Sequence, residues 1–197
     1  MTGAFYRTLR ADLLEGRPVT IANAGATDAR LVVTTSGNPT VQEPAASNGY
    51  TVERTFFKPD GTKADIGKIR QTDRLVVVLR VTEPKAENAR IVLVDRLPAG
   101  FEIADPKLVE GGDASGFSWL QNAVAPAVSE FKDDRFVAAF DRDPSQAATF
   151  EVAYAIRAVT PGRYVQPPAV VEDMYRPERY GRTAFGTIEI APSQAAK

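Results

Sequence analysis

The sequence contains neither cysteine nor histidine among its 197 residues. Without cysteine, disulfides, thiol nucleophiles and thiolate metal sites are excluded from this chain. Without histidine, the chain lacks the usual general base near neutral pH, the middle member of a Ser/His/Asp triad and the commonest zinc ligand. We therefore expect no enzyme activity, no catalytic residues, no cofactor and no bound metal. The lack of cysteine does not identify a compartment, because exported proteins can also lack it.

The chain also has no excess of one charge and no long apolar run. Lys and Arg number 24 against 25 Asp and Glu, for a formal net charge of -1. Such a balance produces no field to attract nucleic acid or an anionic membrane, so neither partner is expected. The longest apolar runs, such as Leu75–Leu79 and Ile91–Val94, have the length of strands, which excludes a transmembrane helix. No basic-then-apolar signal segment opens the sequence, so we expect either a cytosolic protein or a piece of a larger exported one.

From Tyr50 onward, short apolar and alternating segments are separated by Gly and Pro turns. In residues 149–157, Phe150, Val152, Tyr154 and Ile156 would face one side, which is typical of a half-buried antiparallel strand. This patterning predicts an all-β, antiparallel β-sandwich with at most one or two short helices, one of them near residues 117–122. The predicted strands cover residues 50–58, 74–83, 89–96, 135–140, 148–158, 162–166 and 186–191.

The first 44 residues have a different pattern. Two strands are predicted, Val19–Asn23 and Arg30–Ser36, with a turn between them. Two strands alone bury little surface, so they need a neighbouring sheet in this chain or in missing sequence. Residues 36–49 are rich in helix and strand breakers and are predicted to be a linker, and residues 194–197 a frayed tail.

Several polar and aromatic residues are candidates for binding or chemistry. The acidic residues Asp133, Asp134, Asp141 and Asp143 could bind calcium, although solvated strand ends paired with their own arginines are the simpler interpretation. Paired carboxylates could also serve a hydrolase without histidine, but the sequence does not bring any two of them together. Trp119, the only tryptophan, is expected to cover a core or sheet edge.

A turn is predicted after the strand that ends near Asp95. Pro98 would stop strand pairing there, and Gly100 is expected to supply a positive φ.

Residues 167–183 form a polar segment rich in proline and charge. We predict a stiff loop, because Pro167-Pro168 and Arg176-Pro177 restrict its backbone. Met174 and Tyr175 lie in this segment among charges of both signs, a composition typical of the centre of a protein contact. The residues themselves leave two possibilities open. The pair either folds back to cap one end of the sandwich or is presented to a partner.

Four stretches together resemble the C-terminal, tenth macroglobulin-like (MG10) domain of bacterial α2-macroglobulins: Asp95–Glu102, Asp133–Phe136, Tyr154–Gly162 and Val171–Pro177. The resemblance lies in their order and spacing. It implies an MG10-like β-sandwich over residues 45–193. Residues 1–44 would then hold strands left from a preceding CUB-like sheet, followed by the linker.

The resemblance also implies a function. Bacterial α2-macroglobulins are periplasmic protease traps, anchored to the inner membrane by a lipid at the N-terminus of the parent protein. Their MG10 domain packs on the thioester domain and shields the thioester until a protease cleaves the bait region. In this chain Met174 and Tyr175, with Arg176 and Glu172, match the shielding contact. The implied partners are the thioester domain of the same parent and, through the parent, target proteases.

A rival interpretation is a free-standing adhesion or carbohydrate-binding β-sandwich. In that case the acidic loops and an exposed aromatic residue would form the ligand site. The reading frame upstream of Met1 separates the two interpretations, because only the first expects a Cys-x-x-Gln-type thioester motif there.

Overall fold

The computed structural model describes residues 6–10, 12, 14, 17–36, 41–104, 117, 119–120 and 122–193. The chain divides into two units, residues 1–38 and 39–197. Among the described residues, no helix has the length and apolar character needed to cross a membrane. The predicted frayed tail, residues 194–197, lies outside the described part of the chain.

In the first unit, the two predicted strands are not formed. Residues 17–36 run without strand assignment, and the side chains of Ile21, Leu31 and Val33 are exposed. The apolar pattern that suggested strands is present, but the described residues of this unit form no sheet on which to bury it. Two extended segments cannot supply that sheet by themselves.

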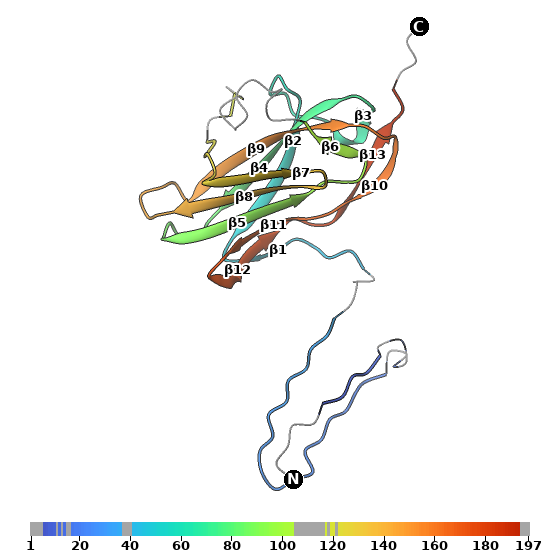
Figure 1. Ribbon diagram of the computed structural model, residues 1–197, viewed down its shortest axis with the longest axis vertical. Coiled ribbons are helices and arrows are strands. Elements are labelled where there is room, and N and C mark those ends of the chain that lie inside the picture. The colour runs from blue at the N-terminus through green and yellow to red at the C-terminus, as the bar shows by residue number, and fades with distance from the viewer. Residues whose placement is uncertain are drawn as a thin grey trace. The chain divides into compact units, whose positions relative to one another are not determined.

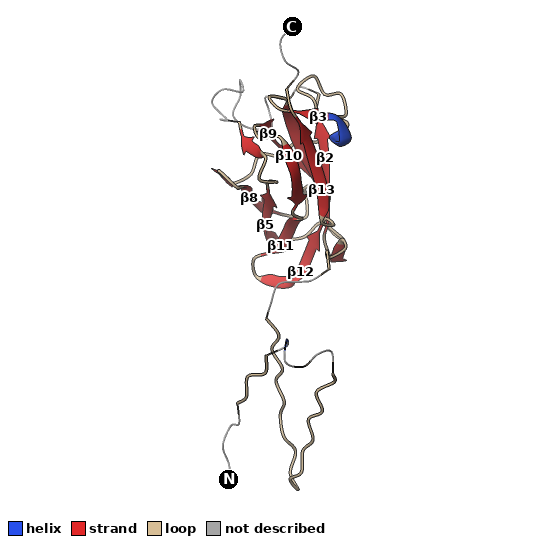
Figure 2. Cartoon of the chain, turned by 90° about the vertical axis from the view of Figure 1, so that its right-hand side faces the viewer, coloured by secondary structure: helices blue, strands red, loops and turns tan. Residues whose placement is uncertain are grey.

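The regular secondary structure in the described residues of the second unit is almost entirely β-strand. One short 3-10 turn, η2 (Ile66–Lys68), precedes β3 (Figure 2). The strands are β1 (Ala46–Asn48), β2 (Thr51–Phe57), β3 (Ile69–Arg70), β4 (Arg74–Thr82), β5 (Ala89–Arg96), β6 (Phe101–Ile103), β7 (Val128–Lys132), β8 (Arg135–Arg142), β9 (Thr149–Ala158), β10 (Gly162–Gln166), β11 (Ala169–Asp173), β12 (Arg176–Arg182) and β13 (Gly186–Ala191).

These strands form three sheets, with the orders β1-β12-β11-β5-β8-β7, β2-β4-β9-β6 and β10-β13-β3 (Figure 1). Every strand pair is antiparallel except β13 with β3. The six-stranded and four-stranded sheets pack face to face, and Phe136 of β8 stacks on Tyr154 of β9 with ring centroids 4.5 Å apart. The predicted antiparallel β-sandwich is therefore confirmed.

Strand β9 shows why the sandwich forms and where the prediction for it was incomplete. Phe150, Val152, Tyr154 and Ile156 are all buried in the main core, as the alternation predicted. The opposite face was expected to be open, yet it is also buried at Glu151 and Ala153. Phe117, Trp119 and Leu120 cover that face. The backbones of Asn122 and Val124 hydrogen-bond to the backbone of Glu151 on β9.

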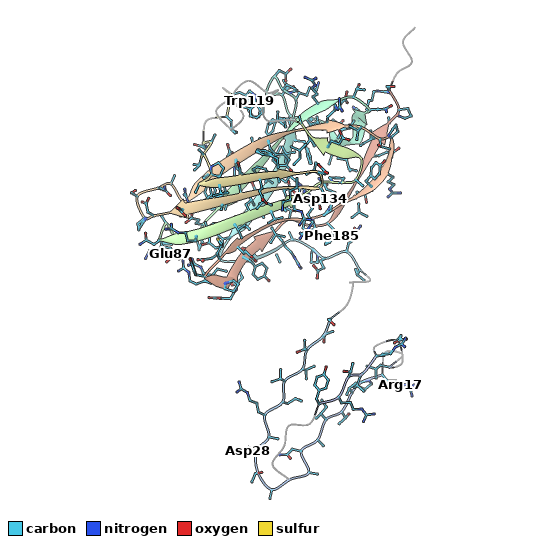
Figure 3. All side chains as sticks on the ribbon, in the orientation of Figure 1. Arg17, Asp28, Glu87, Trp119, Asp134 and Phe185 are labelled. Atoms are coloured by element: carbon cyan, nitrogen blue, oxygen red, sulfur yellow. The ribbon has the colours of Figure 1, made fainter. Side chains whose placement is uncertain are left out.

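Trp119 belongs to this outer layer. Its ring lies 5.0 Å from that of Phe57, and its Nε1 donates a hydrogen bond to the Pro59 carbonyl at 3.3 Å (Figure 3). Gly61 has a φ of +85°, and a Cβ there would lie 2.7 Å from Trp119 Cγ. The expectation that Trp119 covers the sheet is confirmed. Of the short helix predicted near residues 117–122, positions 118 and 121 lie outside the described residues, and the other four are not helical.

The turn after β5 uses glycine for a different reason than predicted. Gly100 is not among the described glycines with positive φ, which are Gly49, Gly61 and Gly162. A Cβ at Gly100 would overlap the Tyr164 ring. Close packing, and not backbone conformation, therefore requires glycine at this position.

Candidate functional site

Residues 167–183 form a β-hairpin, so the prediction of a loop there is wrong. Strand β11 pairs with β5 on one side and with β12 on the other. Its side chains alternate, with Ala169, Val171 and Asp173 buried and Glu172 exposed. This period-two pattern was present in the sequence, but the surrounding prolines and charges obscured it.

Only two residues, Met174 and Tyr175, join the strands of the hairpin. Their exposed fractions are 58 % for Met174 and 80 % for Tyr175. The two side chains are therefore exposed and do not fold back to cap one end of the sandwich. Their use as a contact with a partner stays a prediction.

A β-bulge in β12 lies next to the turn of the hairpin. Glu172 is paired with Tyr180, whereas Asp173 is paired with Arg176, so the residues between Arg176 and Tyr180 have no direct counterparts on β11. Bulges bend a strand and tolerate a residue without an N–H group, which explains how β12 accommodates Pro177. Pro177 therefore lies within strand β12 and not in a loop.

Asp173 fixes the turn that carries Met174 and Tyr175. Its side chain is buried, and its Oδ1 accepts hydrogen bonds from the backbone N–H of Tyr175 at 3.0 Å and of Arg176 at 3.2 Å. The N–H of Met174 donates to the carbonyl of Arg90 on β5 at 2.8 Å. Three consecutive amides of the tip are thus bonded. Sequence reasoning missed Asp173, although an aspartate that bonds the backbone two residues later is a known turn signal.

The other two predicted site residues have different positions. Arg176 does not project with the tip, because its Nε donates to Asp173 Oδ2 at 2.7 Å and its Nη2 to the Asn88 carbonyl at 3.0 Å. Hydrogen bonding to Asp173 raises the pKa of the Arg176 guanidinium. Glu172 lies exposed on the outer face of β11, opposite Val92 of β5 and Tyr180 of β12. The structure therefore places Met174 and Tyr175 at the tip, with Arg176 bracing it from behind.

Three of the four acidic candidates have ordinary structural partners. Asp134 pairs with Arg135 at 2.8 Å, and Asp141 pairs with Arg90 at 3.0 Å. Asp143 accepts a hydrogen bond from the Ser145 N–H, and bonding to Ser145 lowers the pKa of the Asp143 carboxyl. Within the described residues, no group of three or more acidic side chains is arranged to hold a metal ion.

A cavity of about 300 Å³ lies on the outer face of the four-stranded sheet. Its lining includes one carboxylate, Glu102, which pairs with Arg157 at 3.5 Å. The remaining walls are mostly apolar and include Val76, Ala155 and Phe117. A hydrolase of the carboxylate-pair type needs two carboxylates on opposite sides of its substrate, and Glu102 is the one carboxylate among the described residues that line this cavity.

Comparison with protein families gives one match that covers most of the sandwich. Residues 49–178 match the sequence model described as "Bacterial Alpha-2-macroglobulin MG10 domain". The matched segment extends from just before β2 into β12 and therefore includes the tip of the hairpin.

Individual proteins agree with that match. The alpha-2-macroglobulin of Escherichia coli K12 is 35 % identical over 169 residues, which cover 80 % of this chain and 10 % of that protein. Among solved structures, Salmonella alpha-2-macroglobulin reacted with methylamine has a TM-score of 0.67 at 32 % identity, covering 79 % of this chain and 10 % of that one. Trypsin-activated alpha-2-macroglobulin from Escherichia coli has a TM-score of 0.65 at 30 % identity, covering 79 % and 11 %. The chain spans about a tenth of the length of these relatives.

Proposed function

The chain belongs to the bacterial alpha-2-macroglobulin MG10 domain family, and we propose that it docks on the thioester domain of a larger parent protein and shields the thioester. One observation carries this proposal. Met174 and Tyr175 are exposed at a two-residue tip whose backbone amides are all hydrogen-bonded. The domain would act by binding, without chemistry of its own.

The physical demands of shielding match this tip. A thioester lasts only while water and amines are kept away from it, so its guard must be apolar, bulky and fixed in direction. Methionine fills irregular gaps, and tyrosine offers a flat apolar face with a hydroxyl group that can still find a partner. Both side chains would lose their exposed area on docking, which favours the docked state.

The relatives support a wider role for the parent protein. One was solved after reaction with methylamine and another after activation by trypsin. We infer that the parent of this chain is a periplasmic protease trap anchored by an N-terminal lipid. In this proposal, protease cleavage elsewhere in the parent shifts the population away from the docked state and so uncovers the thioester.

Residues 1–44 fit the same proposal as remnants of a CUB-like sheet. Their apolar side chains at Ile21, Leu31 and Val33 are exposed, and no strand is assigned over residues 17–36. Pairing with strands elsewhere in the parent would bury these side chains and give the backbone N–H and C=O groups hydrogen-bond partners.

The test uses the full-length parent protein. Replacing Met174→Ala and Tyr175→Ala together should increase the rate at which methylamine consumes the thioester, measured as release of free thiol. Val165→Ala is a matched control, because Val165 is an exposed apolar residue on β10 and not part of the hairpin. The control should react like the wild type.

An unchanged rate in the double variant would refute shielding by this tip but would leave the family assignment intact. Binding of a glycan by the isolated chain, lost in the same double variant, would instead support the rival carbohydrate-binding function. The family match gives that rival no support, since the matched sequence model describes a macroglobulin domain.

A further inference from the structure

Glu87 joins the hairpin to a part of the sandwich that is distant in sequence. It lies in the loop between β4 and β5, at the same end of the sandwich as the turn of the β11–β12 hairpin (Figure 3). Its Oε1 accepts a hydrogen bond from Arg176 Nη1 at 3.3 Å and another from Arg179 Nη1. Arg176 precedes the bulge and Arg179 is its last residue, so one carboxylate bonds to both ends of the bulge.

Arg176 extends this connection to the tip itself. Its guanidinium bonds Glu87 and the Asn88 carbonyl on one side and Asp173 on the other. Asp173 in turn accepts the N–H of Tyr175. An unbroken series of hydrogen bonds therefore runs from the β4–β5 loop to the backbone of the exposed pair. Planar guanidinium groups suit such bridging, because their donors are held in a fixed fork.

Arg179 extends the connection in the opposite direction, into the core. Its guanidinium carbon lies 5.5 Å from the ring centroid of Tyr50, which is a cation–π contact. Tyr50 is almost fully buried in the main hydrophobic cluster. Through Arg176 and Arg179, Glu87 thus connects the two-residue turn of the hairpin to Tyr50, a buried residue of the core.

The cluster contributes little to folding by itself. Glu87, Arg176 and Arg179 are all partly exposed, and exposed ion pairs add little to the free energy of unfolding. Their geometry is suited to fixing the direction of the hairpin tip, because several charge-assisted hydrogen bonds meet at the bulge and at the turn. A two-residue turn that carries two large exposed side chains would otherwise sample several directions.

We propose that Glu87 is a positioning residue for the Met174–Tyr175 tip, holding it in the direction required for docking on the parent's thioester domain. This inference rests on the proposed shielding function for its biological meaning. The ordering of the tip by Glu87, however, can be measured in this chain alone.

The first experiment compares amide hydrogen exchange by NMR in the wild type and in Glu87→Ala. Exchange should become several-fold faster at Tyr175 and Arg176, whose N–H groups depend on Asp173, and stay unchanged at core amides such as that of Ile91. Glu87→Gln, which keeps an acceptor oxygen without the charge, should restore part of the protection. Glu102→Ala removes another glutamate that pairs with an arginine, and it should leave the tip unaffected.

Two results would overturn the proposal at this level. Exchange at the tip could remain as slow in Glu87→Ala as in the wild type, which would show that Asp173 suffices. Alternatively, exchange could rise equally throughout the domain, which would make Glu87 a general stabilising residue.

The second experiment uses the full-length parent and methylamine. Glu87→Ala should raise the rate of thioester loss, by less than the Met174→Ala/Tyr175→Ala double variant does. If only the double variant raises the rate, Glu87 has no positioning role and the shielding function stands. It is also possible that neither variant raises the rate although amide exchange at the tip is faster in Glu87→Ala. That result would refute the shielding function, and it would also refute the proposal that Glu87 positions the tip for docking.

Discussion

Two networks of paired arginines and carboxylates in this domain differ in where they lie and in what they are expected to do. Between the sheets, Arg54 of β2 pairs with Asp95 of β5, and Asp95 also accepts the Tyr154 hydroxyl at 2.7 Å. At the hairpin, Glu87 pairs with Arg176 and Arg179, and Arg176 also pairs with the buried Asp173. The inner network is almost fully buried, whereas Glu87 and both arginines of the outer one are partly exposed to solvent.

The difference in burial predicts a difference in role. Burial raises the pKa of the Asp95 carboxyl, and the positive charge of Arg54 acts against that shift. Removing one member of such a buried pair leaves an uncompensated charge, so the inner network should govern whether the domain folds. The partly exposed Glu87 of the outer network can be lost without that penalty, so its bonds should govern where the tip points.

The largest expected effect is the loss of the inner carboxylate. Asp95→Ala should lower the free energy of unfolding by about 3–5 kcal/mol, because Arg54 and the Tyr154 hydroxyl would remain buried without their partner. Chemical denaturation monitored by Trp119 fluorescence measures this loss. Asp134→Ala is the control, since Asp134 pairs with an arginine at the surface and should change stability by less than about 0.5 kcal/mol. Equal effects of the two substitutions would contradict the contrast between the networks.

A smaller effect is expected where the hairpin meets the core. Gly181 of β12 lies under the backbone of Tyr50, and a Cβ there would overlap the Tyr50 carbonyl. Because backbone atoms cannot move aside easily, Gly181→Ala should destabilise the domain by about 1–3 kcal/mol. Thermal unfolding tests the loss, and NMR shifts of Tyr50 and the tip test whether both move together. A variant as stable as the wild type would show that β1 and β12 can separate freely.

The outer network should respond to pH. The hydrogen bond from Arg179 lowers the pKa of the Glu87 carboxyl below its usual value. A carboxylate with a lowered folded pKa contributes fully above its unfolded pKa of about 4.3, and that contribution is lost as the pH falls through the folded value. Amide protection at Tyr175, corrected for intrinsic exchange, should therefore decrease below about pH 4 while the core stays protected.

The charged groups around Glu87 define the control for that titration: Arg176, Arg179, Lys85, Asp173 and Glu83. Glu87→Gln should abolish the loss of protection below about pH 4. A pH profile identical to that of the wild type would show that Glu87 is not its source.

The smallest effect on folding is expected at the tip itself. Met174→Ala with Tyr175→Ala should change the free energy of unfolding by no more than about 0.5 kcal/mol, because both side chains are exposed. Denaturation of the isolated chain measures this change. A loss of several kcal/mol would mean that the pair supports the fold, and its use as a docking contact would then need another explanation.

Much of the sandwich could be predicted from local sequence pattern. Strands β5, β10 and β13 begin and end at the predicted residues, and the inward face of β9 was predicted correctly. The strands that were not predicted, β1, β3, β6, β7, β11 and β12, are short or polar, so their apolar periodicity is weak. Their existence depends on neighbours that supply hydrogen bonds and a buried face.

The candidate site shows the same division. Met174 and Tyr175 stand out in the sequence because large apolar residues are rare among so many charges and prolines. Glu87 could not be found this way, because it lies 89 residues from Arg176 and 92 from Arg179. Asp173 could have been found by its turn pattern, but its burial depends on β5 and β12 pairing around it.

The sequence by itself determined the all-β class, the absence of thiol and histidine chemistry, and the presence of an unusual apolar pair near residue 174. These properties follow from composition and from short-range periodicity. Only the tertiary structure decided that the pair is the tip of a hairpin and that Glu87, from the distant β4–β5 loop, is hydrogen-bonded to two arginines of that hairpin. Such decisions depend on contacts between residues far apart in the chain, which no local pattern encodes.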